Sequence, residues 1–232
     1  MLKTIRRLVI LSFIFVLIIS SYYLYQGYSL YRKVISNKDI VETINTIKSK
    51  DTFITIDEIP LIYHDAVISI EDPSFYSHDG INIFSITKAF FKNIQRMSYV
   101  EGGSTITQQI AKNVFFTQDK NLERKIAEVF MAYQLEKYYT KVELFEVYIN
   151  ICYFGDGYTG IFEASIGYFD KMPIELTDYE ATLLAGVPNA PSVYALTNNL
   201  ELAKQRQRIV IEKMIKYEFI TENQGKYILF GF

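Results

Sequence analysis

Glu71 lies in a sequence context that suits a general base. It follows the apolar run AVISI and precedes Asp72 and Pro73 in the segment IEDPSFYSHDGI. Because proline disfavours helix at the residue before it, we expect a helix to end near Glu71, with the carboxylate at the border of the core. Partial burial there would make it a better proton acceptor. A solvated pair of acids at a helix end is the alternative, and spacing alone favours that alternative.

A second acid, Glu128, lies among cations in KNLERKIAEVFMAYQLEKYY, residues 120–139. Arg124 is four residues before it, and Lys125 is beside Arg124. These residues lie opposite the apolar stripe of the same predicted helix, which comprises Leu122, Ile126, Val129, Phe130 and Tyr133. An acid among cations that faces a cleft could serve catalysis. A solvated surface pair worth roughly 0.2–0.5 kcal/mol is the alternative.

The segment EGGSTITQQIAKN, residues 101–113, has the composition of an anion-binding helix start. Its two glycines let the backbone approach a ligand, and Ser104 or Thr105 can cap the following helix. A helix start suits an anionic oxygen, and Lys112, one turn beyond Gln108, adds a point charge for phosphate. An ordinary capped surface helix is the alternative, because the Walker motif GxxxxGK[ST] is absent.

KVELFEVYINICYFGDGYTG, residues 141–160, places Glu143, Glu146 and Asn150 on one face of a helix. Apolar residues cover the rest of that helix, so it is expected to be largely buried. A buried Glu146 needs hydrogen-bonding partners. A structural role for it is at least as well supported as a catalytic one.

These residues must be positioned mainly by helices. Apolar residues recur at helical spacing over 84–97, 105–116 and 122–139, whereas 51–59 indicates a short strand or extended lead-in. Thr140 with Glu143, and Thr177 with Glu180, form capping-box patterns at helix starts. No internal repeat or second-domain linker interrupts the sequence. One mostly α-helical domain is therefore predicted.

The N-terminus predicts a membrane anchor. The 24 residues from Leu8 to Tyr31 carry no charge, and a spanning helix needs about 20. Basic residues precede this stretch and tyrosines collect at its end, so the N-terminus should be cytoplasmic and the rest extracytoplasmic. A cleaved signal peptide is less favoured, because the stretch is long and no A-x-A-like site follows. The predicted division is an anchor over 1–27, a stalk or continuing helix over 28–55, and a catalytic domain over 56–232.

Composition excludes several classes of function. Of 232 residues, half are hydrophobic, and the net charge of -2 offers no basic excess for non-specific nucleic-acid binding. The single cysteine, Cys152, cannot form an intramolecular disulfide. His64 and His78 are the only histidines, which excludes a histidine-rich metal site, and no Cys/His spacing resembles a zinc site. We therefore predict no metal ligands.

Five segments, in their order and spacing, resemble the motifs of glycosyltransferase family 51. This family comprises the peptidoglycan glycosyltransferases, found in class A penicillin-binding proteins and as monofunctional enzymes. The segments are EDPSFYSHDGI, GGSTITQQIAKN, RKIAE, KVELFEVYIN and ATLLAGVPNAPS. The resemblance runs from about Ile56 to Met214. Each segment alone is weak, but the set is highly specific.

The resemblance implies an all-α, lysozyme-like catalytic domain of two lobes around a cleft. It also implies lipid II as substrate, in a reaction that inverts an α-linked donor to a β-1,4 bond. Glu71 is then the general base and Glu128 the second acid. The cations placed in the pyrophosphate region are Lys112, Lys120, Arg124 and Lys125. The residues placed near the sugar-phosphate are Phe75, Ser104, Gln108 and Tyr153.

The chemistry agrees with these implied roles. A sugar hydroxyl is a poor nucleophile until a base accepts its proton, and a pyrophosphate leaving group calls for cations. No cofactor is implied as required, although a Mg²⁺ or Mn²⁺ ion at the pyrophosphate stays open. The implied partners are lipid II, the growing glycan strand, membrane lipid and moenomycin-type inhibitors. Other cell-wall synthesis proteins are conceivable partners, and nucleic acid is not.

The chain departs from the family pattern in a few places. Lys120 stands where Arg is usual, which loses bidentate phosphate geometry. Asn82 replaces a common Asp, and Ala195 and Leu196 replace the usual Asn-Pro. Residues 158–165 and the Pro73-Ser74 pair also differ locally. None of these changes removes an implied catalytic residue, but they make donor binding near Lys120 and Tyr194 less secure.

Ser85-Ile-Thr-Lys88 matches SxxK, the nucleophile motif of penicillin-binding transpeptidases. No SxN or KTG partner motif accompanies it, so we interpret it as a chance match and the enzyme as monofunctional. A lysozyme-like glycan-cleaving enzyme is one rival function, although it would need no phosphate clamp. A catalytically silent lipid II-binding scaffold is the other, although both acids are present.

Overall fold

The structure is a computed structural model that describes residues 2–84, 86–87, 103–117 and 121–230. Its α-helices are α1 Leu2–Asn37, α2 Ile40–Lys48, α3 Leu61–Glu71, α5 Ile106–Phe115, α6 Leu122–Tyr138, α7 Lys141–Ile151, α8 Ile161–Phe169, α9 Asp178–Gly186, α10 Pro191–Tyr194, α11 Leu200–Lys216 and α12 Glu222–Phe230. Single 3-10 turns cover Ile56–Glu58, Phe75–Ser77, Pro173–Glu175 and Val187–Asn189. Within these ranges the regular structure is helical, which confirms the all-α prediction.

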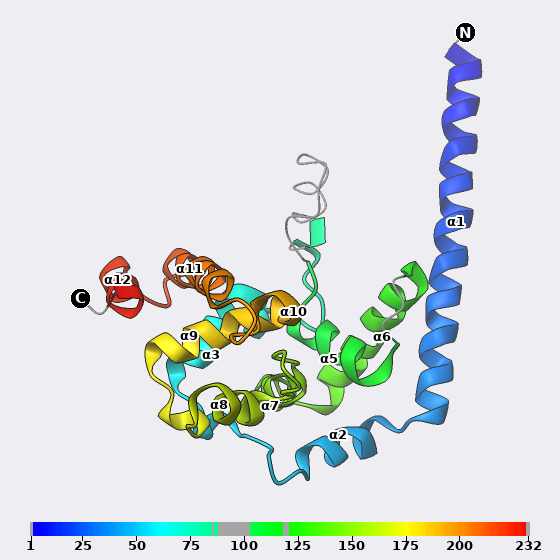
Figure 1. Ribbon diagram of the computed structural model, residues 1–232. Helices are drawn as coiled ribbons and strands as arrows, with labels where there is room; N and C mark the ends of the chain where they lie inside the picture. The colour runs from blue at the N-terminus through cyan, green and yellow to red at the C-terminus, as the bar shows by residue number, and fades with distance from the viewer. Residues whose placement is uncertain (1, 85, 88–102, 118–120, 231–232) are drawn as a thin grey trace.

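Helix α1 runs without a break from the apolar N-terminal segment into the folded domain. It projects away from the other helices at its N-terminal end, as Figure 1 shows. One candidate membrane span lies within it, over Thr4–Asn37, with a mean hydropathy of 2.3 and none of its most apolar stretch buried. The backbone has no interruption at residue 27. Of the two readings of the stalk, the continuing helix is therefore confirmed as far as Asn37.

The domain is built from two neighbouring groups of helices (Figure 1). Helices α3, α9 and α11 pack against one another, while α5 packs against both α6 and α7. Met131 and Leu135 of α6 and Leu144 and Phe145 of α7 are fully buried where the second group meets. The end of α3, which carries Glu71, faces the start of α5.

Helix α7 fixes the segment that leads into α3. Glu146 Oε1 accepts a hydrogen bond from the Ile56 amide at 3.0 Å. Asn150 binds both sides of Ile54, because its Oδ1 accepts from the amide at 2.9 Å and its Nδ2 donates to the carbonyl at 2.7 Å. These bonds give Glu146 a structural role. Of the two alternatives predicted for residues 51–59, the structure shows the extended lead-in, which runs into the 3-10 turn over Ile56–Glu58.

Local capping chemistry sets several helix starts as predicted. The boxes of Thr140 with Glu143 and of Thr177 with Glu180 are both complete. Thr105, one of the two candidate caps of α5, forms a third box with Gln108. The helical pattern over 84–97 falls mostly outside the described residues, and so do Ser85 and Lys88 of the SxxK match.

Candidate active site

Glu71 occupies the last turn of α3, as Pro73 predicts. Asp72 follows it and turns into the core, where its carboxylate accepts hydrogen bonds from His78 Nε2 at 2.9 Å and from the Ile106 amide at 3.2 Å. The second bond ties the loop after α3 to the start of α5. The anionic oxygen at the start of α5 is therefore that of Asp72. Lys112 is then the part of α5 that is suited to bind a phosphate.

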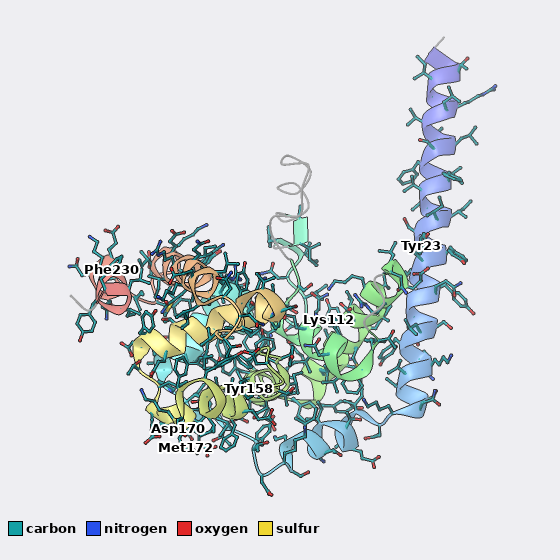
Figure 2. The ribbon with its side chains drawn as sticks, viewed as in Figure 1. Tyr23, Lys112, Tyr158, Asp170, Met172 and Phe230 are labelled. Carbon is teal, nitrogen blue, oxygen red and sulfur yellow. The ribbon has the colours of Figure 1, made fainter. Side chains whose placement is uncertain are left out.

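Glu71 is partly exposed and is oriented by α5. Gln109 Nε2 donates a hydrogen bond to Glu71 Oε2 at 2.7 Å. Lys112 lies one turn further along α5, in the middle of the domain (Figure 2). Its ammonium has no hydrogen bond or ion pair with any other described residue. A neutral amide therefore holds the proposed base, and an unpaired cation lies on the same helix.

Glu128 is completely buried between two cations of its own helix. Its Oε2 accepts a hydrogen bond from Lys125 Nζ at 2.7 Å. Its Oε1 lies 3.0 Å from Arg124 Nε. The Arg124 N–H does not point at this oxygen, so the second contact is an ion pair without a hydrogen bond. The solvated surface pair is excluded, because only 1% of the Glu128 side chain is exposed.

Lys125 connects the cation cluster to the glycine-containing segment before α5. Its ammonium donates to Ser104 Oγ at 2.7 Å as well as to Glu128. Arg124 extends in another direction, with Nη1 donating to the Thr117 carbonyl at 3.1 Å. The structure therefore brings Ser104, Arg124, Lys125 and Glu128 into one cluster.

The remaining predicted site residues that the structure describes form no hydrogen bond or ion pair with Glu71 or Glu128. Phe75 is fully buried under Lys141, whose ammonium lies 4.6 Å from the ring centroid. Gln108 is also buried and caps α5, and its Nε2 has no hydrogen-bond partner among the described atoms. Tyr153 is half-exposed on the loop after α7, with its hydroxyl accepting from the Gly157 amide. Lys120 lies outside the described residues. Phe75 and Gln108 offer a substrate almost no surface in this conformation.

Helix α6 does not turn its apolar stripe toward the core of the domain, as a simple amphipathic helix would. Its apolar stripe contacts α1, where the Phe130 ring lies 5.2 Å from that of Tyr28. The face toward the core carries Ala127 and Met131 together with Glu128. The acid is thus buried although it lies opposite the apolar stripe, because its own face of α6 packs into the domain while α1 packs against part of the stripe.

Comparison with known proteins settles the family. A family model described as transglycosylase matches residues 37–215. A monofunctional glycosyltransferase of Staphylococcus aureus (strain JH9) is 36% identical over 197 residues, which cover 82% of this chain and 73% of that protein. The chain belongs to the transglycosylase family. Its class of activity is peptidoglycan glycosyl transfer.

Two much longer proteins also match part of this chain. Penicillin-binding protein 1F of Bacillus subtilis (strain 168) is 41% identical over 172 residues, which cover 74% of this chain but 24% of that protein. The chain thus spans about a quarter of that relative's length. A crystal structure of penicillin-binding protein 1A from Haemophilus influenzae covers 77% of this chain and 17% of its own, at 19% identity and a TM-score of 0.43. That likeness is too weak to carry an argument.

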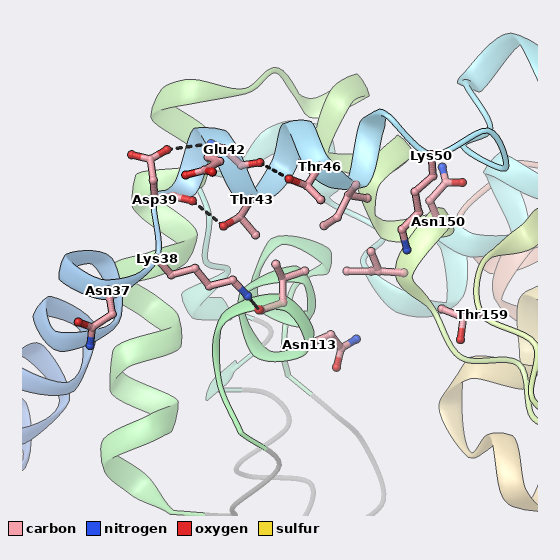
Figure 3. Close-up of a pocket in the computed structure, with 13 residues that line it drawn as sticks. Asn37, Lys38, Asp39, Glu42, Thr43, Thr46, Lys50, Asn113, Asn150 and Thr159 are labelled. Atoms are coloured by element: carbon pink, nitrogen blue, oxygen red, sulfur yellow. Dashed lines mark hydrogen bonds between the residues drawn. The ribbon is translucent and has the colours of Figure 1, made fainter.

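An open groove of about 640 Å³ lies apart from the site of this transglycosylase (Figure 3). Helix α2 forms one wall through Thr43 and Thr46, and the ends of α5 and α7 contribute Asn113 and Asn150. None of the predicted site residues lines it. The groove therefore does not identify the catalytic centre, which rests on the contacts of Glu71 and Glu128.

Two parts of the site were not predicted from the sequence. Gln109, which orients Glu71, lies in the STITQQ motif, and its neighbour Gln108 was assigned instead. The capping-box pattern of Thr105 with Gln108 is the signal that distinguishes the two, because the Gln108 side chain bonds to the start of its own helix and that of Gln109 does not. The Asp72–His78 pair had the weaker signal of an acid and a histidine six residues apart. Among the described residues, no three His, Cys, Asp or Glu side chains gather as a metal site.

Proposed function

We propose that the protein polymerises lipid II, the undecaprenyl-pyrophosphoryl disaccharide-pentapeptide, into glycan strands. The reaction would invert the α-linked donor, form β-1,4 bonds and release undecaprenyl pyrophosphate. The observation that carries this proposal is the contrast between its two acids. Glu71 is partly exposed and held by a neutral amide, whereas Glu128 has both oxygens against cations. Two carboxylates in such different surroundings suit different roles.

Glu71 is proposed as the base that activates the acceptor. It accepts the proton of the acceptor 4-hydroxyl as that oxygen forms a bond to C1 of the donor sugar. The bond from C1 to the pyrophosphate oxygen breaks, and its electron pair leaves with the pyrophosphate. Gln109 occupies Oε2 of Glu71, which leaves Oε1 for the hydroxyl. The amide thereby selects the oxygen that does the chemistry.

The cation cluster is proposed to hold the leaving group. Lys112 has no partner among the described residues, and Lys125 is partly exposed, so both can approach a phosphate. Cations placed where negative charge develops stabilise the transition state. Glu128 is buried and lies between Arg124 and Lys125, so it is not placed to meet the acceptor hydroxyl. Its role is to orient these cations, and Ser104 helps by binding Lys125.

No cofactor is proposed as required, since three side-chain cations are available to the pyrophosphate. A Mg²⁺ or Mn²⁺ ion would have to bind mainly through the substrate's own phosphates, as divalent ions commonly do at phosphate sites. Turnover measured in the presence of a chelator tests this point. Loss of most turnover, restored by either ion, would contradict it.

We further propose that α1 crosses the membrane once, with its N-terminus in the cytoplasm. Arg6 and Arg7 precede the apolar segment, and tyrosines follow it. The catalytic domain then lies outside, where it shares the membrane with its lipid-linked substrate. Moenomycin-type inhibitors are the expected competitors at the donor side, and other cell-wall synthesis proteins remain candidate partners.

The experiment is polymerisation of labelled lipid II by the purified full-length protein. We expect long strands that lysozyme digests, inhibition by moenomycin and none by a β-lactam. Incubation with preformed strands distinguishes the glycan-cleaving rival, because shortened strands would support cleavage. Binding of lipid II without any product would instead support the scaffold.

A further inference from the structure

Helices α1 and α6 approach each other so closely at Gly27 that only glycine fits there. Gly27 is buried, and a Cβ at this position would lie 2.5 Å from Cγ2 of Ile126 and 2.6 Å from its Cβ. The Glu123 carbonyl oxygen would be 3.0 Å away. Glycine inside a helix costs about 1 kcal/mol relative to alanine, so its presence here indicates a packing requirement.

Aromatic contacts extend this approach along both helices. The Phe130 ring of α6 lies 5.2 Å from the Tyr28 ring and 5.8 Å from the Tyr31 ring. Tyr31 is 8% exposed. The segment from Gly27 to Tyr31, which we call the docking segment, therefore packs against Ile126 and Phe130 of the apolar stripe of α6.

The same helix α6 presents the cation cluster on another face. At 100° per residue, Arg124 and Glu128 project roughly 160° away from Ile126 around the helix axis. Glu128 is packed into the domain and bound to Lys125, so one helix contacts the docking segment on one face and carries the cluster on the other. A shift of α6 away from α1 would carry the cluster with it.

The docking segment also connects the cluster to the membrane. Helix α1 is continuous from the apolar N-terminal residues through Gly27 and on to Asn37, with no flexible linker between them. Each helical residue adds about 1.5 Å along the axis. The number of residues between the most apolar stretch of α1 and Gly27 therefore fixes the height of α6 relative to the bilayer.

We propose that the docking segment, with Gly27 at its closest contact, positions Arg124 and Lys125 at the depth of the lipid-linked pyrophosphate. This inference rests on the proposed function. Gly27 is a positioning residue and acts through α6 without touching substrate. The anchor is then part of the geometry of the active site and does more than raise the local enzyme concentration. Misplacement of about 1 Å from outside a catalytic centre can cost on the order of a hundredfold in rate.

The first two variants place leucine on the face of α1 that contacts α6 and on an exposed face of α1. Gly27→Leu forces the helices apart, whereas Ser29→Leu places the same side chain two residues on, on an exposed face. Both changes favour helix, so propensity cannot explain a loss. We expect Gly27→Leu to lower the turnover number about tenfold to a hundredfold in detergent, and Ser29→Leu to keep parental turnover.

A size exchange guards against simple misfolding. Gly27→Ala should lower turnover, and adding Ile126→Gly, which removes both atoms nearest the new Cβ, should restore most of it. A positioning role has a further signature, because Gly27→Leu should cost little in a Lys125→Ala background. Fully additive losses in that background would mean that Gly27 serves only stability, and would overturn the proposal.

The outcomes separate the two levels of inference. A parent that polymerises lipid II while Gly27→Leu and Gly27→Ala match it overturns the positioning role alone. A parent that folds and makes no polymer overturns the proposed function and the positioning role together. Loss in Gly27→Ala, rescue by Ile126→Gly and non-additivity with Lys125→Ala would support the proposal.

Discussion

The ammonium of Lys125 lies 2.7 Å from Oε2 of Glu128, a carboxylate that is almost completely removed from solvent. Glu128→Gln would remove one negative charge and leave Arg124 and Lys125 without their buried partner. We expect turnover to fall by about a hundredfold or more through misplaced cations. The free energy of unfolding should also fall by roughly 3–5 kcal/mol, as when one member of a buried pair is lost. Glu123→Gln, on the same helix, is the control, and parental turnover in Glu128→Gln would contradict this role.

Lys112→Ala and Arg124→Ala test the leaving-group site. Each removes a cation proposed to stabilise charge on the departing pyrophosphate, so each should cost about 3 kcal/mol, or on the order of a hundredfold in turnover. Lys137→Ala removes an exposed cation near the end of α6 and should change little. Steady-state rates at saturating lipid II provide the measurement. Near-normal rates in both variants would place the pyrophosphate elsewhere.

Gln109→Ala tests the orientation of the base. It removes the 2.7 Å hydrogen bond to Glu71 Oε2 and leaves the carboxylate in place. Hydrogen bonds to charged groups are worth roughly 1.5–3 kcal/mol, so we expect a loss of about tenfold to a hundredfold in turnover. Asn113→Ala, one turn further along α5 and exposed, is the matched control. An equal loss in both variants would point to damage to α5 instead.

Cys152 offers a test of the core beneath Glu71. Burial raises the pKa of its thiol to about 12. At pH 8 roughly one molecule in ten thousand would then carry the reactive thiolate. We expect the folded protein to resist a thiol-specific reagent at this pH and to react promptly once unfolded in denaturant. Rapid labelling of the folded protein would show that the packing around Tyr148 and Cys152 is wrong.

Local chemistry made some features predictable from sequence and hid others. Pro73 set the end of α3, and threonine–acid boxes set the starts of α7 and α9, because those signals act within four residues. The bond between Gln109 and Glu71 joins residues 38 apart and has no local signal. The burial of Glu128 depends on how α6 packs against the rest of the domain, which periodicity within α6 cannot reveal.

The most direct test of the account is lipid II polymerisation by Glu71→Gln. Glutamine keeps the size of the side chain but cannot accept the acceptor's proton at neutral pH. We expect the rate to fall by about a hundredfold to ten-thousandfold. Folding, followed by thermal unfolding, and binding of lipid II should both persist. A Glu71→Gln protein that polymerises lipid II at the parental rate would contradict the assignment of the base, and with it the central claim.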